Sequence, residues 1–364
     1  MKLGYHAPLP PAPTGVADYA RALLAALAPY FDIEVNARRA DLHLYQAGNN
    51  QLHRAIIERS LREPGAVLLH DANLHHFYLG ALSREAYVRE FREQYGEWGR
   101  EFAERLWSRR GRSAADARYF EYPMLGSVVG RARLVLVHNR AAAAIARRHG
   151  AKRVEEIPHL HTAPAPVPER EVIELRGRLG LTGAHYLFAV FGHLRETKRV
   201  AAILRSFRRA RARQGNIALL VAGRFVSADL ERACEPWLAG EGVLRAGYLD
   251  EREFWLHARA ADCCLNLRYP SCGETSGIAI RLMGLGKPVV VSDGEEYSAH
   301  PEGSYLPIGS GPSGEAELEE WMVTLARDPG LGRDIGLRAG RHITREHDAA
   351  EVGRRLAVLL RQLQ

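Results

Sequence analysis

The sequence lacks most of the short motifs that would assign a 364-residue chain to a familiar nucleotide-binding or hydrolytic class. We identify no G-x-G-x-x-G that follows a predicted strand and opens a predicted helix, which argues against a nicotinamide-dependent oxidoreductase. No G-x-x-x-x-G-K-[ST] occurs, which excludes a P-loop NTPase. No G-x-S-x-G nucleophile elbow occurs either. Because no Asp-x-Asp is present, a Mg²⁺ ion held by paired carboxylates is not indicated, and we expect no metal and no cofactor.

Long apolar runs and regularly spaced cysteines are also missing. No stretch approaches the roughly 20 apolar residues that cross a bilayer. The chain opens on an apparent strand without a charged and then apolar leader, so we expect no export. Of the four cysteines, Cys263 and Cys264 lie in an apolar segment, and no spacing resembles a zinc site. These features predict a reduced, cytoplasmic protein.

The basic residues are spread unevenly over a chain of net charge +7. Many arginines lie between Arg84 and Arg118, interleaved with aromatic residues. Two interpretations stay open: a solvated helical face, or a surface that contacts anionic lipid at the cytoplasmic membrane or an anionic acceptor. No recognition module for nucleic acid surrounds these residues, so we expect no nucleic-acid partner.

Apolar strands and amphipathic helices alternate in two series, which predicts parallel sheets with helices on both faces. A segment with three alternating prolines, 162–168, separates the series and favours a stiff connector. We therefore predict an α/β protein with two Rossmann-like doubly wound domains facing a cleft, at residues 1–165 and 166–344, with a last helix near 345–364 packing back on the first domain. Other predicted helices span 86–107 and 316–326.

The segment Tyr269-Pro-Ser-Cys-Gly-Glu-Thr-Ser-Gly277 carries the strongest functional signal. It joins an apolar strand to an amphipathic helix, and ligands of doubly wound sheets bind at such strand ends. Its glycines permit close backbone approach, while Glu274, Thr275 and Ser276 place a carboxylate and two hydroxyls at a helix N-terminus. A helix N-terminus favours anions, so the segment predicts a site for a phosphate and its attached sugar.

A second strand end gathers positive charge. Gly192 and His193 follow a predicted strand, and Arg195, Lys198 and Arg199 lie at the entrance of the next helix. Cations at a helix N-terminus oppose the helix dipole, so a bound anion explains them better than a structural role does. Guanidinium, ammonium and N–H donors together suit a diphosphate. A solvated basic helix start is the alternative.

Two strand ends in the first series also point to the cleft. The loop 10–19 leads through Gly15 into a helix, where backbone could approach a phosphate, although an ordinary strand–helix turn fits equally. His70 and Asp71 end a further apolar strand, and His70 could bond a sugar hydroxyl or stabilise developing charge. The adjacent His75 and His76 project differently from a helix, which argues against a metal there.

These segments together resemble the retaining glycosyltransferases of family 4, which have the GT-B fold, and among them bacterial enzymes of polysaccharide and surface-glycan assembly. The resemblance implies that Gly15 approaches the donor phosphate and that His70 contacts the donor sugar and supports the transition state. It implies that Lys198 binds the diphosphate and that Glu274 holds a sugar hydroxyl. The amides of 275–277 would face the diphosphate.

The chain departs from the family pattern at two places. The family often has arginine where His193 stands, and Arg195 could substitute. The acidic residue that holds the nucleotide ribose usually lies eight positions after the one matching Glu274; here that position is Leu282, and Arg281 is its polar neighbour.

The implied reaction is transfer of a hexose from a nucleotide-diphosphate sugar, UDP- or GDP-linked, to a glycan, lipid-linked or small-molecule acceptor, without a metal. A sugar-nucleotide epimerase or hydrolase of the same fold and an inactive sugar-nucleotide-binding protein are the alternatives. The sequence assigns neither the donor nor the acceptor.

Overall fold

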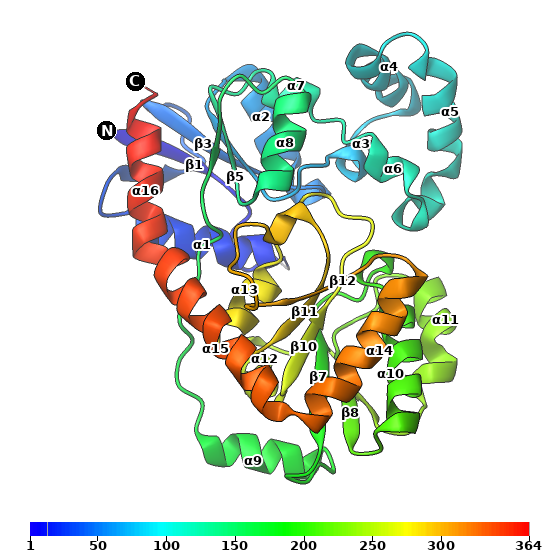
Figure 1. Ribbon diagram of the computed structural model, residues 1–364. Coiled ribbons are helices and arrows are strands. Elements are labelled where there is room, and N and C mark those ends of the chain that lie inside the picture. Colours follow the sequence, from blue (N-terminus) through cyan, green and yellow to red (C-terminus); the bar gives the residue numbers. More distant parts are fainter. Residues whose placement is uncertain (13, 364) are drawn as a thin grey trace.

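The computed structural model describes residues 1–12 and 14–363, and its backbone forms two parallel six-stranded sheets (Figure 1). The first sheet has the strand order β2-β1-β3-β4-β5-β6. Every neighbouring pair in it is parallel. Its strands are β1 (Lys2–His6), β2 (Asp32–Val35), β3 (Leu42–Ala47), β4 (Ala66–Leu69), β5 (Leu134–Val137) and β6 (Val154–Glu156).

The second sheet has the order β12-β11-β10-β7-β8-β9 and is likewise parallel throughout. Its strands are β7 (Tyr186–Phe191), β8 (Ile217–Ala222), β9 (Val243–Ala246), β10 (Cys263–Asn266), β11 (Val289–Ser292) and β12 (Leu306–Ile308). The predicted α/β class with two doubly wound sheets is therefore confirmed.

Strand β7 shows why these segments are continuously apolar. Its alternate residues Tyr186, Phe188 and Val190 belong to one buried cluster. The residues between them, from Leu187 to Phe191, belong to another. Successive strand residues point to opposite faces, so a sheet covered by helices on both sides needs apolar residues at every position.

The helices of the first half pack on both faces of its sheet, and one predicted helix is wrong. Residues 86–107 form two helices, because Gly96 ends the first with a φ of 92° that favours glycine. The elements are α1 (Gly15–Leu27), η1 (Gln51–His53), α2 (Arg54–Arg62), α3 (His75–Ala81), α4 (Arg84–Tyr95), α5 (Gly99–Arg109), η2 (Arg110–Ala115), α6 (Arg118–Glu121), α7 (Gly126–Val129) and α8 (Arg140–Arg148).

The second half contains helices that the sequence pattern did not predict. Helix α9 follows the proline-rich linker, and α15 is capped by Asp328, whose side chain accepts a hydrogen bond from the Leu331 N–H. The elements are α9 (Glu169–Arg178), η3 (Glu196–Lys198), α10 (Val200–Arg213), α11 (Ala228–Leu238), α12 (Glu251–Ala260), α13 (Gly277–Gly284), η4 (Glu295–Tyr297), α14 (Pro312–Arg327), α15 (Pro329–Glu346) and α16 (Ala349–Arg361).

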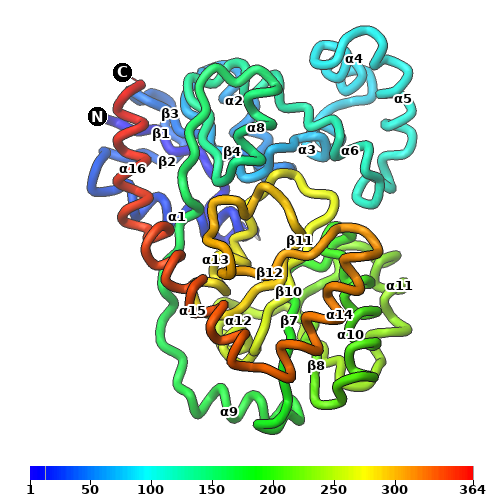
Figure 2. The backbone as a smooth tube through the Cα atoms, viewed as in Figure 1, coloured from blue at the N-terminus to red at the C-terminus, as the bar shows by residue number. Residues whose placement is uncertain are grey.

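The chain ends on the domain where it began. Helix α16 lies beside α1 (Figure 2). Leu356 and Leu360 of α16 share a buried cluster with Leu23 and Leu27 of α1. A Cβ atom at Gly353 would come within 2.5 Å of the Ala26 carbonyl oxygen, so the glycine allows this close helix contact. Helices α15 and α16 thus cross from the second sheet to the first.

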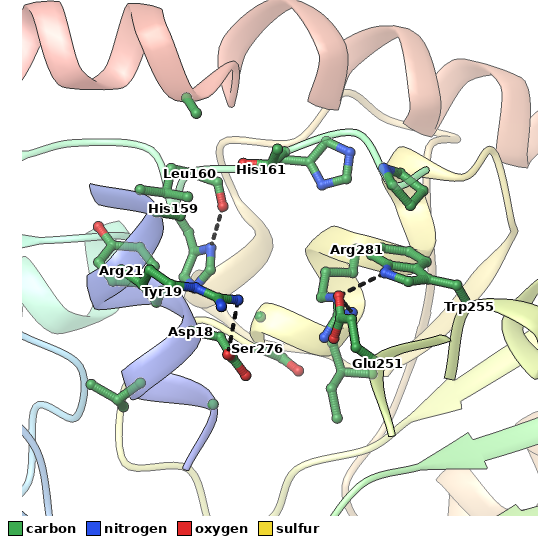
Figure 3. Close-up of a pocket in the computed structure, with 18 of the residues that line it drawn as sticks. Asp18, Tyr19, Arg21, His159, Leu160, His161, Glu251, Trp255, Ser276 and Arg281 are labelled. Carbon is green, nitrogen blue, oxygen red and sulfur yellow. Dashed lines mark hydrogen bonds and ion pairs between the residues drawn. The ribbon is translucent and has the colours of Figure 1, made fainter. Parts of the chain in front are cut away.

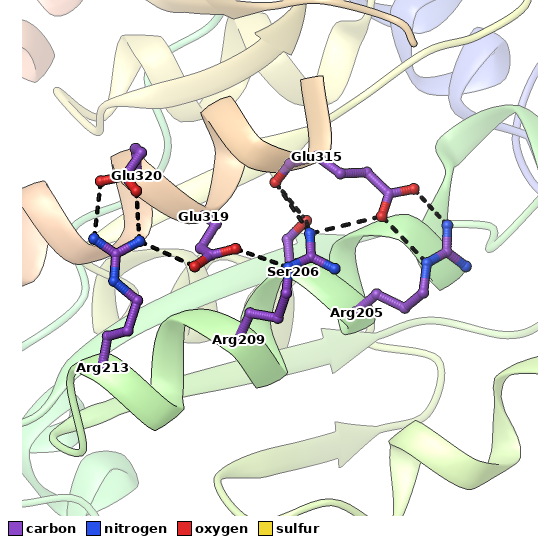
Figure 4. A network of polar contacts seen from close by, with 7 residues as sticks. All are labelled: Arg205, Ser206, Arg209, Arg213, Glu315, Glu319 and Glu320. Carbon is purple, nitrogen blue, oxygen red and sulfur yellow. Dashed lines mark hydrogen bonds and ion pairs between the residues drawn. The ribbon is translucent and has the colours of Figure 1, made fainter. Parts of the chain in front are cut away.

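A ladder of ion pairs joins α10 to α14 on the second domain (Figure 4). Arg205 pairs with Glu315, Arg209 pairs with Glu319 at 2.7 Å, and Arg213 pairs with Glu319 at 2.9 Å. These side chains are partly exposed, so each pair contributes only about 0–1 kcal/mol. The carboxylates nevertheless neutralise the most basic helix of this domain.

A G-x-G-x-x-G segment does lie between a strand and a helix, which corrects the sequence analysis. Residues 309–314 connect β12, an edge strand that was not predicted, to α14. Glu317 accepts a hydrogen bond from the Gly309 N–H at 2.9 Å. A Cβ atom at Gly314 would collide with the Gly309 carbonyl. The glycines therefore form a tight loop at the edge of the sheet, and the Gly309 N–H of this loop is already bonded to Glu317.

Among the described residues, no helix combines the length and the apolar character needed to cross a membrane.

Candidate functional site

A cavity of about 1410 Å³ lies between the two domains. Helices α1 and α13 begin at its wall, and the linker that follows β6 runs along it (Figure 3). Ten of the twelve predicted site residues line it: Gly15, His70, His193, Arg195, Lys198, Glu274, Thr275, Ser276, Gly277 and Arg281. The structure thus brings together strand ends from both halves of the chain.

Lys198 is the most unusual cation of the cavity. Its side chain is only 4% exposed, and its ammonium donates to the Phe191 carbonyl. Burial lowers the pKa of Lys198 well below its usual range, and the nearby Arg268 and Arg195 lower it further. A bound anion would reverse this effect, because an opposite charge favours the protonated amine.

His193 shares this positive region without adding a charge. Burial lowers the pKa of its imidazole, and Arg195, Lys198 and Arg224 act in the same direction. A neutral imidazole can still donate one hydrogen bond. His193 therefore offers a donor beside three cations.

The N-terminus of α13 faces the same part of the cavity. Ser276 caps the helix, since its hydroxyl accepts from the Ala279 N–H at 3.3 Å and donates to the Asn266 side chain at 3.1 Å. Its hydroxyl hydrogen is therefore already committed. The first N–H groups of a helix have no partner within it, so Gly277 and Ile278 present donors. A Cβ atom at Gly277 would meet the His159 ring at 3.2 Å.

Glu274 is a half-buried carboxyl held in a defined position. It accepts from the Cys272 N–H at 2.7 Å and lies 3.2 Å from the Arg268 guanidinium. Burial raises its pKa, Arg268 opposes that shift, and the neighbouring Asp71 carboxylate adds to it. Burial likewise raises the pKa of Asp71, which accepts from the Asn49 N–H at 2.8 Å. Two carboxyl groups thus face the cavity from different domains.

His70 is neutral and has one acceptor nitrogen. Its Nε2 lies 2.8 Å from the side-chain oxygen of Gln46, which can only accept, so Nε2 carries the proton and Nδ1 carries the lone pair. Burial lowers its pKa well below the usual value. Tyr19 packs edge-on against it, with ring centroids 5.0 Å apart, and the buried Tyr19 hydroxyl has no partner within the described chain.

Gly15 and Arg281 line the cavity from different domains. A Cβ atom at Gly15 would meet nothing within 4 Å, so this end of α1 borders open space. The Arg281 guanidinium pairs with Glu251 at 2.6 Å and stacks on the Trp255 ring at 4.2 Å (Figure 3). Leu282, where the family pattern places a carboxylate, is 1% exposed and belongs to the core.

Two predicted residues do not line the cavity. Gly192 lies behind Lys198: its φ is 89°, and a Cβ atom there would come within 2.6 Å of Ile278 and 3.2 Å of the Lys198 ammonium. Arg199 adopts a left-handed φ of 55°, and its guanidinium donates to the carbonyls of Gly309 and Gly311. Arg199 therefore braces the β12–α14 loop.

Three residues outside the predicted site set belong here: Asp71, which the sequence pattern indicated only as the neighbour of His70 at a strand end, and Arg268 and Asn139, which were not predicted. Arg268 and Asp71 line the cavity, and each lies two residues after the end of a strand, which was the available signal. Asn139 caps α8 through its oxygen, and its amide nitrogen donates to the Gly273 carbonyl at 3.0 Å and to Thr275 at 2.8 Å. No sequence signal connects residues so far apart.

No family profile and no curated protein matches the chain. Solved structures do match the chain. HepE of Anabaena in complex with UDP-glucose is 13% identical, with a TM-score of 0.64 and 100% of each chain covered. Sucrose-phosphate synthase of Thermosynechococcus elongatus is 16% identical, with a TM-score of 0.63 and coverage of 100% of this chain and 99% of that one.

WaaG, a glycosyltransferase involved in lipopolysaccharide biosynthesis, is 12% identical, with a TM-score of 0.62 and coverage of 98% of this chain and 99% of that one. At such identities the likeness establishes the fold. The predicted GT-B architecture is confirmed.

Proposed function

We propose that the protein is a retaining glycosyltransferase that moves a hexose from a nucleotide-diphosphate sugar to an acceptor hydroxyl. The observation that carries this proposal is the buried ammonium of Lys198, which lies near Arg195 and Arg268 and has no carboxylate at ion-pair distance among the described residues. A diphosphate is the ligand whose charge and oxygen acceptors suit that cluster.

The diphosphate would lie between this cluster and the start of α13. Lys198, Arg195 and Arg268 would neutralise its charge, and the N–H groups at Thr275–Gly277 would bond its oxygens. The lack of Asp-x-Asp fits neutralisation by side chains instead of a metal. On this proposal Gly15 keeps the opposite helix end open for the phosphate, while His193 donates a neutral hydrogen bond.

The hexose would lie between the two domains. His70 Nδ1 can accept from a sugar hydroxyl, and Glu274 can accept from another. Arg281 is already engaged by Glu251, so we propose that it shapes the nucleotide pocket and makes no direct phosphate contact. Arg199 and Gly192 position the loops around Lys198.

The proposed reaction takes place on one face of the sugar. The acceptor oxygen forms a bond to the anomeric carbon as the bond to the β-phosphate oxygen breaks, and the acceptor proton passes to that leaving oxygen. No protein base is needed. Stabilising the charge on the leaving diphosphate supplies most of the acceleration.

We propose UDP-sugars as the first donors to test, because the HepE structures hold UDP and UDP-glucose. The acceptor would be a glycan, a lipid-linked sugar or a small molecule. The arginines of α4, α5 and η2 suit peripheral contact with an anionic membrane surface in the cytoplasm.

The test is a thermal shift series with UDP, GDP, ADP, dTDP and their sugar conjugates, with NADH as a control. A rise with one nucleotide family would support the diphosphate site, and no rise with millimolar nucleotide would refute it. Sugar release or epimerisation without acceptor would favour the epimerase or hydrolase. Tight binding without any turnover would favour an inactive binding protein, and a response to NADH alone would favour an oxidoreductase.

A further inference from the structure

Outside the cavity, His300 meets two histidines from a distant part of the sequence, His342 and His347. His300 follows η4, His342 lies near the end of α15, and His347 directly follows that helix. Their potential ligand atoms all lie within 4.8 Å of one another. The ring centroids are 5.0 Å apart for His300 and His342, 5.6 Å for His300 and His347, and 5.5 Å for His342 and His347. In the part of the chain that the structure describes, no other three His, Cys, Asp or Glu residues come together in this way.

Buried nitrogens of these rings lack hydrogen-bond partners. Both ring nitrogens of His300 and Nδ1 of His342 are buried and unpaired among the described residues. Burial lowers the pKa of His300 to about 3, the neighbouring His347 and His342 rings lower it further, and the Tyr297 carbonyl partly opposes the shift. Burial also lowers the pKa of His342. Neutral imidazoles with unused lone pairs are the form that binds a metal ion.

His347 is fixed in a metal-binding tautomer. Its Nδ1 lies 2.7 Å from the His159 carbonyl oxygen, which can only accept, so Nδ1 carries the proton and Nε2 carries the lone pair. Histidine ligands of metals usually donate their other N–H in this way, because that bond orients the ring and raises its basicity. The His347 side chain is 5% exposed.

We propose that His300, His342 and His347 bind a divalent transition-metal ion of the zinc class. Tetrahedral zinc, with Zn–N bonds of about 2.0–2.1 Å, places its ligand nitrogens roughly 3.4 Å apart, so small ring movements from the observed cluster suffice. The Glu346 carboxylate lies near His342 and His347 and favours a cation there, although it also pairs with Arg345. A fourth position would remain for water.

The site would reinforce the hinge between the domains. The His347 carbonyl accepts from the His161 N–H at 2.6 Å, and its ring holds the His159 carbonyl. His159 and His161 belong to the linker that lines the cavity. An ion on these imidazoles would therefore tie the loop after η4 and the end of α15 to that linker. This inference stands independently of the proposed sugar transfer.

The experiment titrates the chain, produced without a histidine tag, with Co²⁺ and then with Zn²⁺. The expected result is one equivalent of Co²⁺ with the intense visible absorption of a tetrahedral site, its displacement by Zn²⁺, and a Zn²⁺-dependent rise in melting temperature. His300→Ala and His342→Gln should each weaken Zn²⁺ binding by more than the roughly 10–100-fold that losing an outer-shell partner costs. His149→Gln, which changes a histidine outside the cluster, should bind like the wild type.

Two results would overturn the proposal. One is a wild-type chain that shows neither the cobalt band nor a melting shift at millimolar metal; this outcome does not depend on any variant folding. The other is unchanged affinity in both cluster variants, which would mean that the ion binds elsewhere and that the three rings only pack against one another.

Discussion

Replacing Lys198 by methionine tests the proposed diphosphate site most directly. Methionine keeps an unbranched side chain of similar length and removes only the ammonium. In the unliganded protein the loss leaves the Phe191 carbonyl without its donor, a cost of about 1–3 kcal/mol. It also removes a buried cation beside Arg195 and Arg268, which offsets part of that cost. We therefore expect a folded protein with a modestly changed melting temperature.

Binding and turnover should change much more. Losing one preorganised electrostatic donor lowers kcat by about 10²–10³-fold. At a nucleotide concentration of a hundred times Kd the ligand stabilises the fold by about 2.7 kcal/mol. If affinity falls 100-fold, that stabilisation drops to roughly 0.4 kcal/mol at the same concentration. At about 2–4 °C per kcal/mol, the nucleotide-dependent shift would shrink from roughly 5–10 °C to about 1 °C.

Lys287→Met is the matched control for this prediction. The Lys287 ammonium is partly buried and donates to the carbonyls of Arg259 and Ala261 at 2.8 and 2.6 Å, but it does not line the cavity. The assay is release of the nucleotide diphosphate under saturating donor, with thermal shift on the same samples. Near-normal turnover in Lys198→Met, or an equal loss in both variants, would refute the assigned role.

Three further predictions address the cavity, the domain contact and the buried histidines. Gly15→Leu should fold at least as well as the wild type, because the space around Gly15 is open and glycine is a poor helix former. The rise in melting temperature on adding nucleotide should nevertheless become smaller. An unchanged rise would mean that α1 does not contribute to nucleotide binding. Asn139→Asp keeps the α8 cap but replaces two donated hydrogen bonds to the 273–275 loop with a buried carboxylate facing the Gly273 carbonyl, so the urea midpoint should fall and the donor KM should rise; an unchanged KM would separate this contact from donor binding. Burial lowers the pKa of His75 to about 3 and that of His138 to about 4. Below about pH 6.5 the unfolded chain therefore binds more protons than the folded chain does. Each of the two histidines then lowers the free energy of unfolding by about 1.4 kcal/mol per pH unit, until the pH reaches its folded pKa. Urea denaturation should give a lower free energy of unfolding at pH 5.5 than at pH 7.5, and His138→Gln should make this difference smaller. An equal free energy of unfolding at the two pH values would contradict the burial of these rings.

The sequence predicted the site best where one short segment contains a whole local structure. The strand, glycine loop and helix around 269–277 appear as expected, since local spacing determines where a helix N-terminus lies. Arg199 does not line the cavity, and the reason is again local. Its left-handed backbone turns the side chain toward the β12–α14 loop, and no neighbouring residue type indicated that.

Long-range contacts could not be predicted from one sequence. His300, His342 and His347 meet only because the end of α15 lies against the loop after η4, and α15 itself was not predicted despite Asp328 and Pro329 at its start. A cap residue followed by proline is a recognised helix start, so that omission was avoidable. The convergence of the rings could not be predicted, because the separation of 42 positions between His300 and His342 leaves no periodic pattern in the sequence.

Gly273 shows how the two domains jointly define the candidate site. Its φ is 68°, and a Cβ atom there would lie only 3.0 Å from that of Ala72 in the other domain. On either side of it the loop is held by that domain, through the Ala72 N–H to the Cys272 carbonyl at 2.7 Å and through Asn139 to Thr275. Glu274 lies between these contacts. Its position relative to His70 is therefore set by closure of the domains, and a bulkier residue at 273 would separate the two groups without touching either.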